Sequence, residues 1–123
     1  MTPEKVFKKI ARDFTDLVPT EVFHHCGEQT GKYEEYCIRI TVPYKITWLT
    51  VAILLHELGH VLCDNEWVNL LIILERCFGR YNKKGVAYKI DEGTATALAG
   101  ALAIKYSIYK KVSRYINQME TGL

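Results

Sequence analysis

A long apolar stretch that contains three polar side chains constrains the fold of this chain more than any other feature. It runs from Ile46 to Cys63 (ITWLTVAILLHELGHVLC) and contains His56, Glu57 and His60. Because such a trio is costly near the middle of a membrane span, the stretch favours a buried helix of a soluble domain over an intramembrane one. We therefore expect this helix to lie in the protein core.

Length and charge limit the classes of protein to consider. The 123 residues fit one domain, 1–123, and 49% hydrophobic with 24% charged residues is an ordinary globular composition. A net charge of +2 gives no electrostatic case for nucleic acid or an anionic membrane, so neither partner is expected. The sequence leaves the oligomeric state open.

The cysteines and the N-terminus predict a cytoplasmic protein. The sequence has four cysteines and no CxxC pair among them, which argues against a zinc ribbon and against a dense disulfide framework. They are Cys26, Cys37, Cys63 and Cys77. Residues 1–14 resemble a charged amphipathic helix and lack the apolar core of a leader peptide. We expect reduced thiols.

The remaining patterns predict an α+β fold. Residues 21–26 and 33–42 are expected to be strands, forming a hairpin or a small antiparallel sheet. Three or four helices should pack on this sheet, and residues 79–85 should form a basic loop between two of them. The expected helices are residues 2–17, 47–63, 66–78 and 91–119, the last bent near Gly100.

The spacing of His56 and His60 predicts a metal site. Side chains four apart on a helix lie one turn apart on the same face, so both imidazoles can reach one ion. Glu57 is rotated about 100° from His56 and can face the open coordination position, where it would take a proton from bound water. Two imidazoles with a carboxylate and an open position favour Zn²⁺.

The third ligand has several candidates. Glu66 and Asp64 follow the histidines closely, and Cys63 is a soft ligand on the same helix. Glu92 is the strongest candidate because small residues follow it at helical spacing, which would let its helix pack against Gly59. The small residues are Ala95, Thr96, Ala99 and Ala103.

The HELGH motif with a downstream helical glutamate resembles the gluzincin metallopeptidases. The stretch that begins at Glu92 is similar to the third-ligand helix of ImmA/IrrE-type peptidases, and minigluzincins are similar in size. The matching positions are Glu92, Ala95, Leu98, Ala99 and Leu102, and the resemblance covers about residues 33–106.

This resemblance implies a zincin-like domain with zinc-dependent peptidase activity. The metal ligands would be His56, His60 and Glu92, and Glu57 would be the catalytic general base and acid. A protein or peptide substrate would pair with the sheet edge formed by the strand at 33–42 or by its hairpin mate. Such a peptidase also needs a hydrogen-bond donor to the oxyanion of the transition state, and the sequence leaves four candidates: Tyr81, Tyr88, Tyr106 and Arg114. The alternative is a metal-containing binding or regulatory module without turnover.

Overall fold

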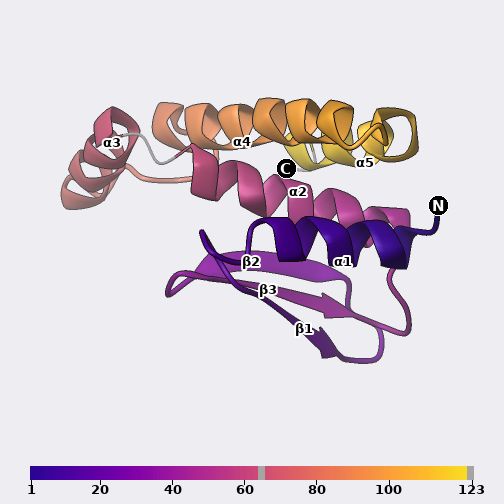
Figure 1. The fold of residues 1–123 in the computed structure, drawn as a ribbon. Helices are drawn as coiled ribbons and strands as arrows, with labels where there is room; N and C mark the ends of the chain where they lie inside the picture. The colour runs from indigo at the N-terminus through magenta and orange to yellow at the C-terminus, as the bar shows by residue number, and fades with distance from the viewer. Residues whose placement is uncertain (64–65, 122–123) are drawn as a thin grey trace.

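The computed structural model describes residues 1–63 and 66–121, which form a three-stranded sheet and five helices (Figure 1). The fold is therefore α+β, as predicted, with more helices than the three or four expected. In chain order the elements are α1 (Pro3–Asp13), β1 (Thr20–His24), β2 (Thr30–Glu34), β3 (Cys37–Val42), α2 (Trp48–Leu62), α3 (Glu66–Cys77), α4 (Val86–Lys105) and α5 (Tyr109–Thr121).

Helix α2 is the centre of the fold. It lies between the sheet on one side and α4 on the other, with α1 beside it (Figure 1). Leu54, Leu55 and Leu58 are fully buried. The helix begins where the sequence predicted, with Thr47 as its N-cap. The side chain of Thr50, three residues on, reaches back, and its Oγ1 accepts the backbone N–H of Thr47 at 3.0 Å, as in a capping box.

The sheet is mixed, which corrects the antiparallel sheet expected from the sequence. Strand order is β1-β3-β2, with β1 parallel and β2 antiparallel to β3. The stretch 33–42 is not one strand, because Glu35 and Tyr36 form a tight turn within it, with φ of 53° and 62°. Such two-residue turns usually contain Asn or Gly, so Glu-Tyr gave no turn signal in the sequence.

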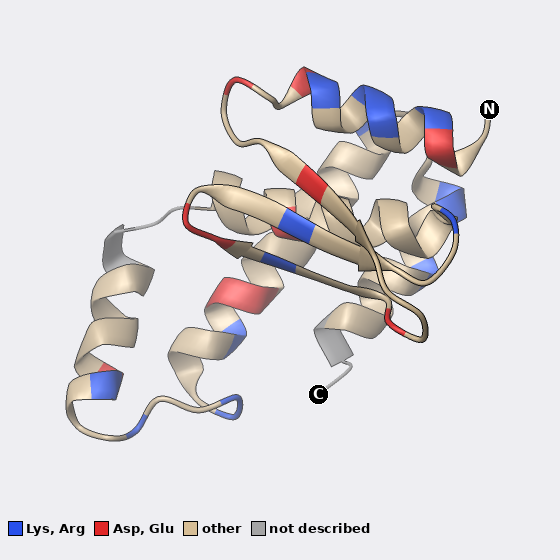
Figure 2. Cartoon of the chain, turned by 90° about the horizontal axis from the view of Figure 1, so that it is seen from below, with Lys and Arg blue, Asp and Glu red and all other residues tan. Residues whose placement is uncertain are grey.

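The alternation of the sequence predicts that Ile38, Ile40 and Val42 share one face of β3, and this is confirmed, although Cys37, which the alternation places on the other face, is buried as well. Ile38, Ile40 and Val42 are fully buried under the helices, whereas Arg39 lies on the opposite face. Arg39 forms ion pairs there with three acidic side chains, Glu21, Glu34 and Glu35. This face of the sheet is turned toward the viewer in Figure 2, and no helix covers it.

The long C-terminal helix of the prediction is two helices. Helix α4 begins at Val86, five residues earlier than expected, and ends at Lys105. The helix is interrupted near Ser107, which has a φ of 59°, whereas α4 continues as one helix through Gly100. Backbone N–H groups of Ile108 and Ser107 donate to the carbonyls of Ala103 and Ile104, the hydrogen-bond pattern of a Schellman cap. The prediction missed this break because the left-handed residue is serine and not glycine.

Helix α1 is shorter than predicted, since it ends at Asp13 and gives way to turns up to Leu17. Among residues 1–63 and 66–121, none of the helices has both the length and the apolarity needed to cross a membrane. All four cysteines are free.

Candidate metal centre

His56 and His60 lie one turn apart on α2 and face the same point, as the sequence predicted. Their Nε2 atoms are 3.2 Å apart. His56 is only 6% exposed, and its ring meets that of His60 edge to face. The two ring nitrogens therefore converge at the boundary between the buried core and a cleft.

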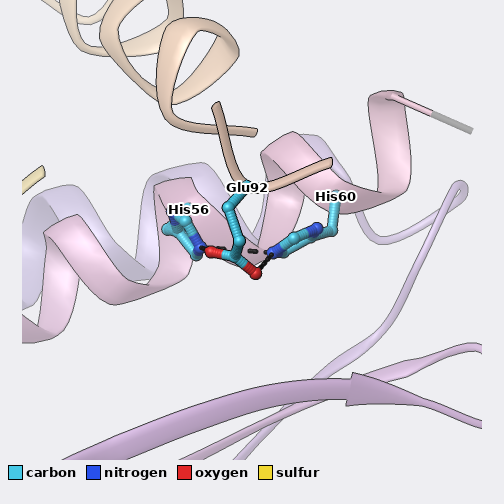
Figure 3. Close-up of side chains that lie close together, drawn as sticks. All are labelled: His56, His60 and Glu92. Carbon is cyan, nitrogen blue, oxygen red and sulfur yellow. Dashed lines mark hydrogen bonds and ion pairs between the residues drawn. The ribbon is translucent and has the colours of Figure 1, made fainter. Parts of the chain in front are cut away.

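Glu92 completes the cluster from α4. Its Oε2 lies 2.9 Å from Nε2 of His56, and its Oε1 lies 3.1 Å from Nε2 of His60. The carboxylate spans the two imidazoles (Figure 3). One ligand atom from each of the three residues can be chosen so that all lie within 4.8 Å of one another. Glu92 lies in the second turn of α4 and not at its start, because α4 begins before Asp91.

Small residues bring α4 close enough for this contact. A Cβ added to Gly59 would lie 2.3 Å from the carbonyl oxygen of Ala95 and 2.9 Å from its Cα. Ala95, Ala99 and Ala103 are fully buried on the same side of α4. The predicted packing of a small-residue face against Gly59 is thus confirmed, and it explains how the Glu92 carboxylate reaches the histidines.

The three side chains perturb one another's ionisation strongly. Burial opposes a charge on His60, but hydrogen bonds and negative charges from Asp91 and Glu92 outweigh it and raise the pKa of His60 to about 10. Burial likewise opposes a charge on Glu92, but the hydrogen bonds and charges of His56 and His60 lower the pKa of Glu92 to about 2. The opposite directions of the two pKa shifts are those of an acidic and a basic group in direct contact.

The donor set fits a divalent metal ion. Two imidazole nitrogens and a carboxylate oxygen, converging from two helices beside a cleft, are the ligands of an open three-residue site. Metal-binding histidines commonly donate their other N–H to a carboxylate. Nδ1 of His60 has such a partner in Asp91, at 3.3 Å, whereas Nδ1 of His56 is buried without a partner among the residues described. The cluster could hold a metal ion.

Asp91 is the residue that sequence reasoning missed. Its real position is inside α4, where its carboxylate holds the ring of His60. The signal was available: an acidic residue next to a metal ligand is a candidate partner for a ligating histidine.

A cleft of about 610 Å³ opens directly at the cluster. Glu57 lines it together with His60 and Glu92, and burial raises the pKa of the Glu57 carboxyl. Strand β2 forms another wall. A Cβ on Gly31 would lie 2.3 Å from Cγ2 of Ile53, so glycine is what lets β2 approach α2 beside Glu57. The other lining residues are Lys32, Tyr33, Tyr36, Val61, Cys63, Asn69 and Asp91.

Of the other ligand candidates, the structure describes the side chain of Cys63, and it does not join the cluster. Cys63 lines the cleft but contributes no atom to the group of three. Asp64, and the side chain of Glu66, fall outside the residues that the structure describes.

The structure separates the four candidates for an oxyanion donor. Tyr106 is committed elsewhere, since its hydroxyl donates to Asp13 at 2.7 Å. Arg114 stacks on Tyr115. Tyr81 packs against Tyr88, and burial together with the charge of Glu92 raises the pKa of Tyr88, which places Tyr88 within electrostatic reach of the cluster.

Comparisons with protein-family models, with curated proteins and with solved structures found no match to this chain. The resemblance to gluzincins stays a prediction from the residues.

Proposed function

We propose that this protein is a zinc-dependent metallopeptidase with a zincin-like domain. The observation that carries the proposal is the convergence of His56, His60 and Glu92 at a cleft that Glu57 also lines. These three residues would hold the ion. Zinc at such a site supplies Lewis acidity, which activates water and polarises a carbonyl group.

Glu57 is suited to move a proton. It is adjacent in sequence to the first ligand yet outside the ligand group, and it faces the cleft. Because burial raises the pKa of its carboxyl, Glu57 is a stronger base than an exposed glutamate. In peptide hydrolysis Glu57 would accept the proton of the attacking water and pass it to the leaving nitrogen.

Strand β2 supports a peptide as substrate. It is an outer strand of the sheet, paired with β3 on one side only among the described elements, and three of its residues line the cleft. An extended peptide that pairs with this edge would lie across Glu57 and the ligands. Substrate binding by strand addition follows from this placement.

The first test is metal content. Purified protein saturated with Zn²⁺ and then dialysed should retain about one zinc per chain by elemental analysis, because a three-residue site binds one ion. Glu57→Gln should retain the same amount, whereas Glu92→Ala should lose it. Zinc retained in full by Glu92→Ala would contradict the ligand set.

The second test is turnover on a proteome-derived peptide library, read by mass spectrometry. Glu57→Gln should lower the cleavage rate by at least about 100-fold, the usual contribution of a general base. Glu21→Gln, on the open face of the sheet, is the matched control and should cleave like wild type. A wild-type protein that binds zinc and cleaves nothing would instead be the binding or regulatory module.

A further inference from the structure

Helix α3 presents apolar side chains to solvent. Leu70, Ile73, Leu74 and Cys77 recur at i, i+3, i+4 and i+7, so they form one stripe along the helix, and all are exposed. Ile73 is 56% exposed, and Phe78, directly after the helix, is 72% exposed. We call these five residues the α3 ridge. An apolar stripe of this length facing water is unusual and indicates an interaction surface.

The ridge projects from the body of the protein. Helix α3 packs against α4 and stands at one end of the molecule, away from the sheet and α1 (Figure 1). Within residues 68–77 of the helix, Val68 is buried, and Leu71 and Ile72 are partly buried. The exposed stripe is thus a convex surface and not a groove.

Positive charge is concentrated beside the ridge. Residues 70–90 contain five of the chain's 16 Lys and Arg but only one of its 14 Asp and Glu, so this segment has a net charge of +4 while the rest of the chain has −2. Figure 2 shows these cations (blue) at the end of α3 and along the following loop. Within the described part of the chain, Lys83 and Lys84 have no acidic partner.

We propose that the α3 ridge and this basic segment dock on an anionic lipid surface. Interfacial helices bury their apolar face about 5–10 Å into a bilayer while Lys and Arg stay at the headgroups. A convex ridge flanked by cations matches that requirement. A second copy of the chain would bring two basic segments together, which like-charge repulsion opposes.

This docking gives the protein a membrane partner that the overall charge of +2 did not suggest, because the −2 of the rest of the chain offsets half of the +4 of residues 70–90. It involves no membrane-spanning segment. Since Asn69 of α3 also lines the cleft, docking would hold the candidate metal centre close to the lipid surface.

The test is flotation of the full chain with vesicles of phosphatidylcholine alone and of phosphatidylcholine mixed with phosphatidylglycerol. Binding should require the anionic lipid and weaken at high salt. Lys83→Gln/Lys84→Gln should weaken binding by about 30-fold, at about 1 kcal/mol for each cation. Lys110→Gln/Lys111→Gln on α5 is the matched control and should bind like wild type.

A second pair of variants tests the ridge itself. Ile73→Gln should weaken vesicle binding by about tenfold or more, since it removes a side chain that would be buried in lipid. Ile104→Gln is the control, because Ile104 is 66% exposed on α4. Circular dichroism checks that each variant folds. Glu92→Ala should bind vesicles like wild type. This variant therefore tests lipid docking independently of the peptidase proposal.

Three results would overturn lipid docking. The first is no binding to anionic vesicles at low salt. The second is binding to soluble polyglutamate but not to vesicles, which would indicate an acidic protein partner. The third is a wild-type dimer in sedimentation equilibrium that Ile73→Gln dissociates, which would show that a second copy covers the ridge.

Discussion

Gly59 of α2 lies directly against the backbone of Ala95 in α4, so that any side chain at position 59 would clash with a main-chain carbonyl. The backbone of α4 cannot move aside as a flexible side chain would. This contact sets the distance between the two helices that contribute the candidate metal ligands. The candidate metal centre therefore depends on a residue that contributes no ligand atom.

Gly59→Ala is expected to lower the free energy of unfolding by roughly 1–3 kcal/mol, the usual cost of overpacking a core. It should also weaken zinc binding, because the helices must separate. Denaturant unfolding and a zinc titration measure the two effects. Gly100→Ala is the matched control: its new Cβ would meet only Cε2 of Tyr109, at 3.9 Å, and a better helix former should stabilise α4 by about 0.5–1 kcal/mol. An equally stable Gly59→Ala would contradict the close contact.

Asp91→Ala is expected to weaken zinc affinity roughly 10–100-fold, because the ring of His60 loses the carboxylate that orients it. Competition with a chromophoric chelator measures the affinity. Asp91→Asn keeps an acceptor oxygen without the charge and should fall between wild type and Asp91→Ala. Asp16→Asn, an exposed residue after α1, should bind zinc like wild type. If Asp91→Ala does so too, Asp91 has no positioning role.

Ser107→Gly is expected to stabilise the protein by about 0.5–1 kcal/mol, because Ser107 has a φ of 59° and glycine adopts this conformation without a steric penalty. The same change at Ser113, inside α5, should destabilise by about 0.5 kcal/mol. Thermal unfolding of both variants gives the comparison. Destabilisation by both would argue that the chain does not break at Ser107.

The Tyr106–Asp13 hydrogen bond predicts a dependence of stability on alkaline pH. Burial and the Asp13 carboxylate raise the pKa of Tyr106 to about 12, above its ordinary value of about 10. Since the folded pKa is the higher one, the contribution to stability is complete below pH 10 and is lost as pH rises through 12.

Tyr106→Phe should therefore be less stable than wild type at pH 8, and the difference should shrink toward pH 12. Unfolding in urea at a series of pH values measures this. Tyr109→Phe is the control, because Tyr109 is exposed. A difference that grows with pH would contradict the direction of the pKa shift.

The parts of the fold that follow from side-chain periodicity were predictable. The apolar run predicted α2 to within about one residue at each end, and alternation predicted which side of β3 carries its buried isoleucines. The histidine spacing and the small face around Ala95 predicted the three residues that converge. In each case the spacing of the side chains indicates which of them share one side of the helix or strand.

The errors arise where backbone conformation is not signalled by the residue type. Glu35, Tyr36 and Ser107 all have positive φ. The turn between β2 and β3 and the interruption between α4 and α5 were therefore missed. The parallel pairing of β1 with β3 depends on the order in which distant strands assemble, which alternation does not encode. The contact of Asp91 with His60 was missed because α4 begins about one and a half turns before residue 91, where the sequence predicted its start.

The position of α2 between the sheet and α4 has a consequence for hydrogen exchange. Amides of α2 should exchange most slowly, through global unfolding, because both sides of the helix are covered. Those of α3, which among the described elements packs mainly on α4, should open locally and exchange much faster. The histidines thus belong to the most persistent part of the molecule, and the ridge can rearrange on meeting a surface without disturbing them.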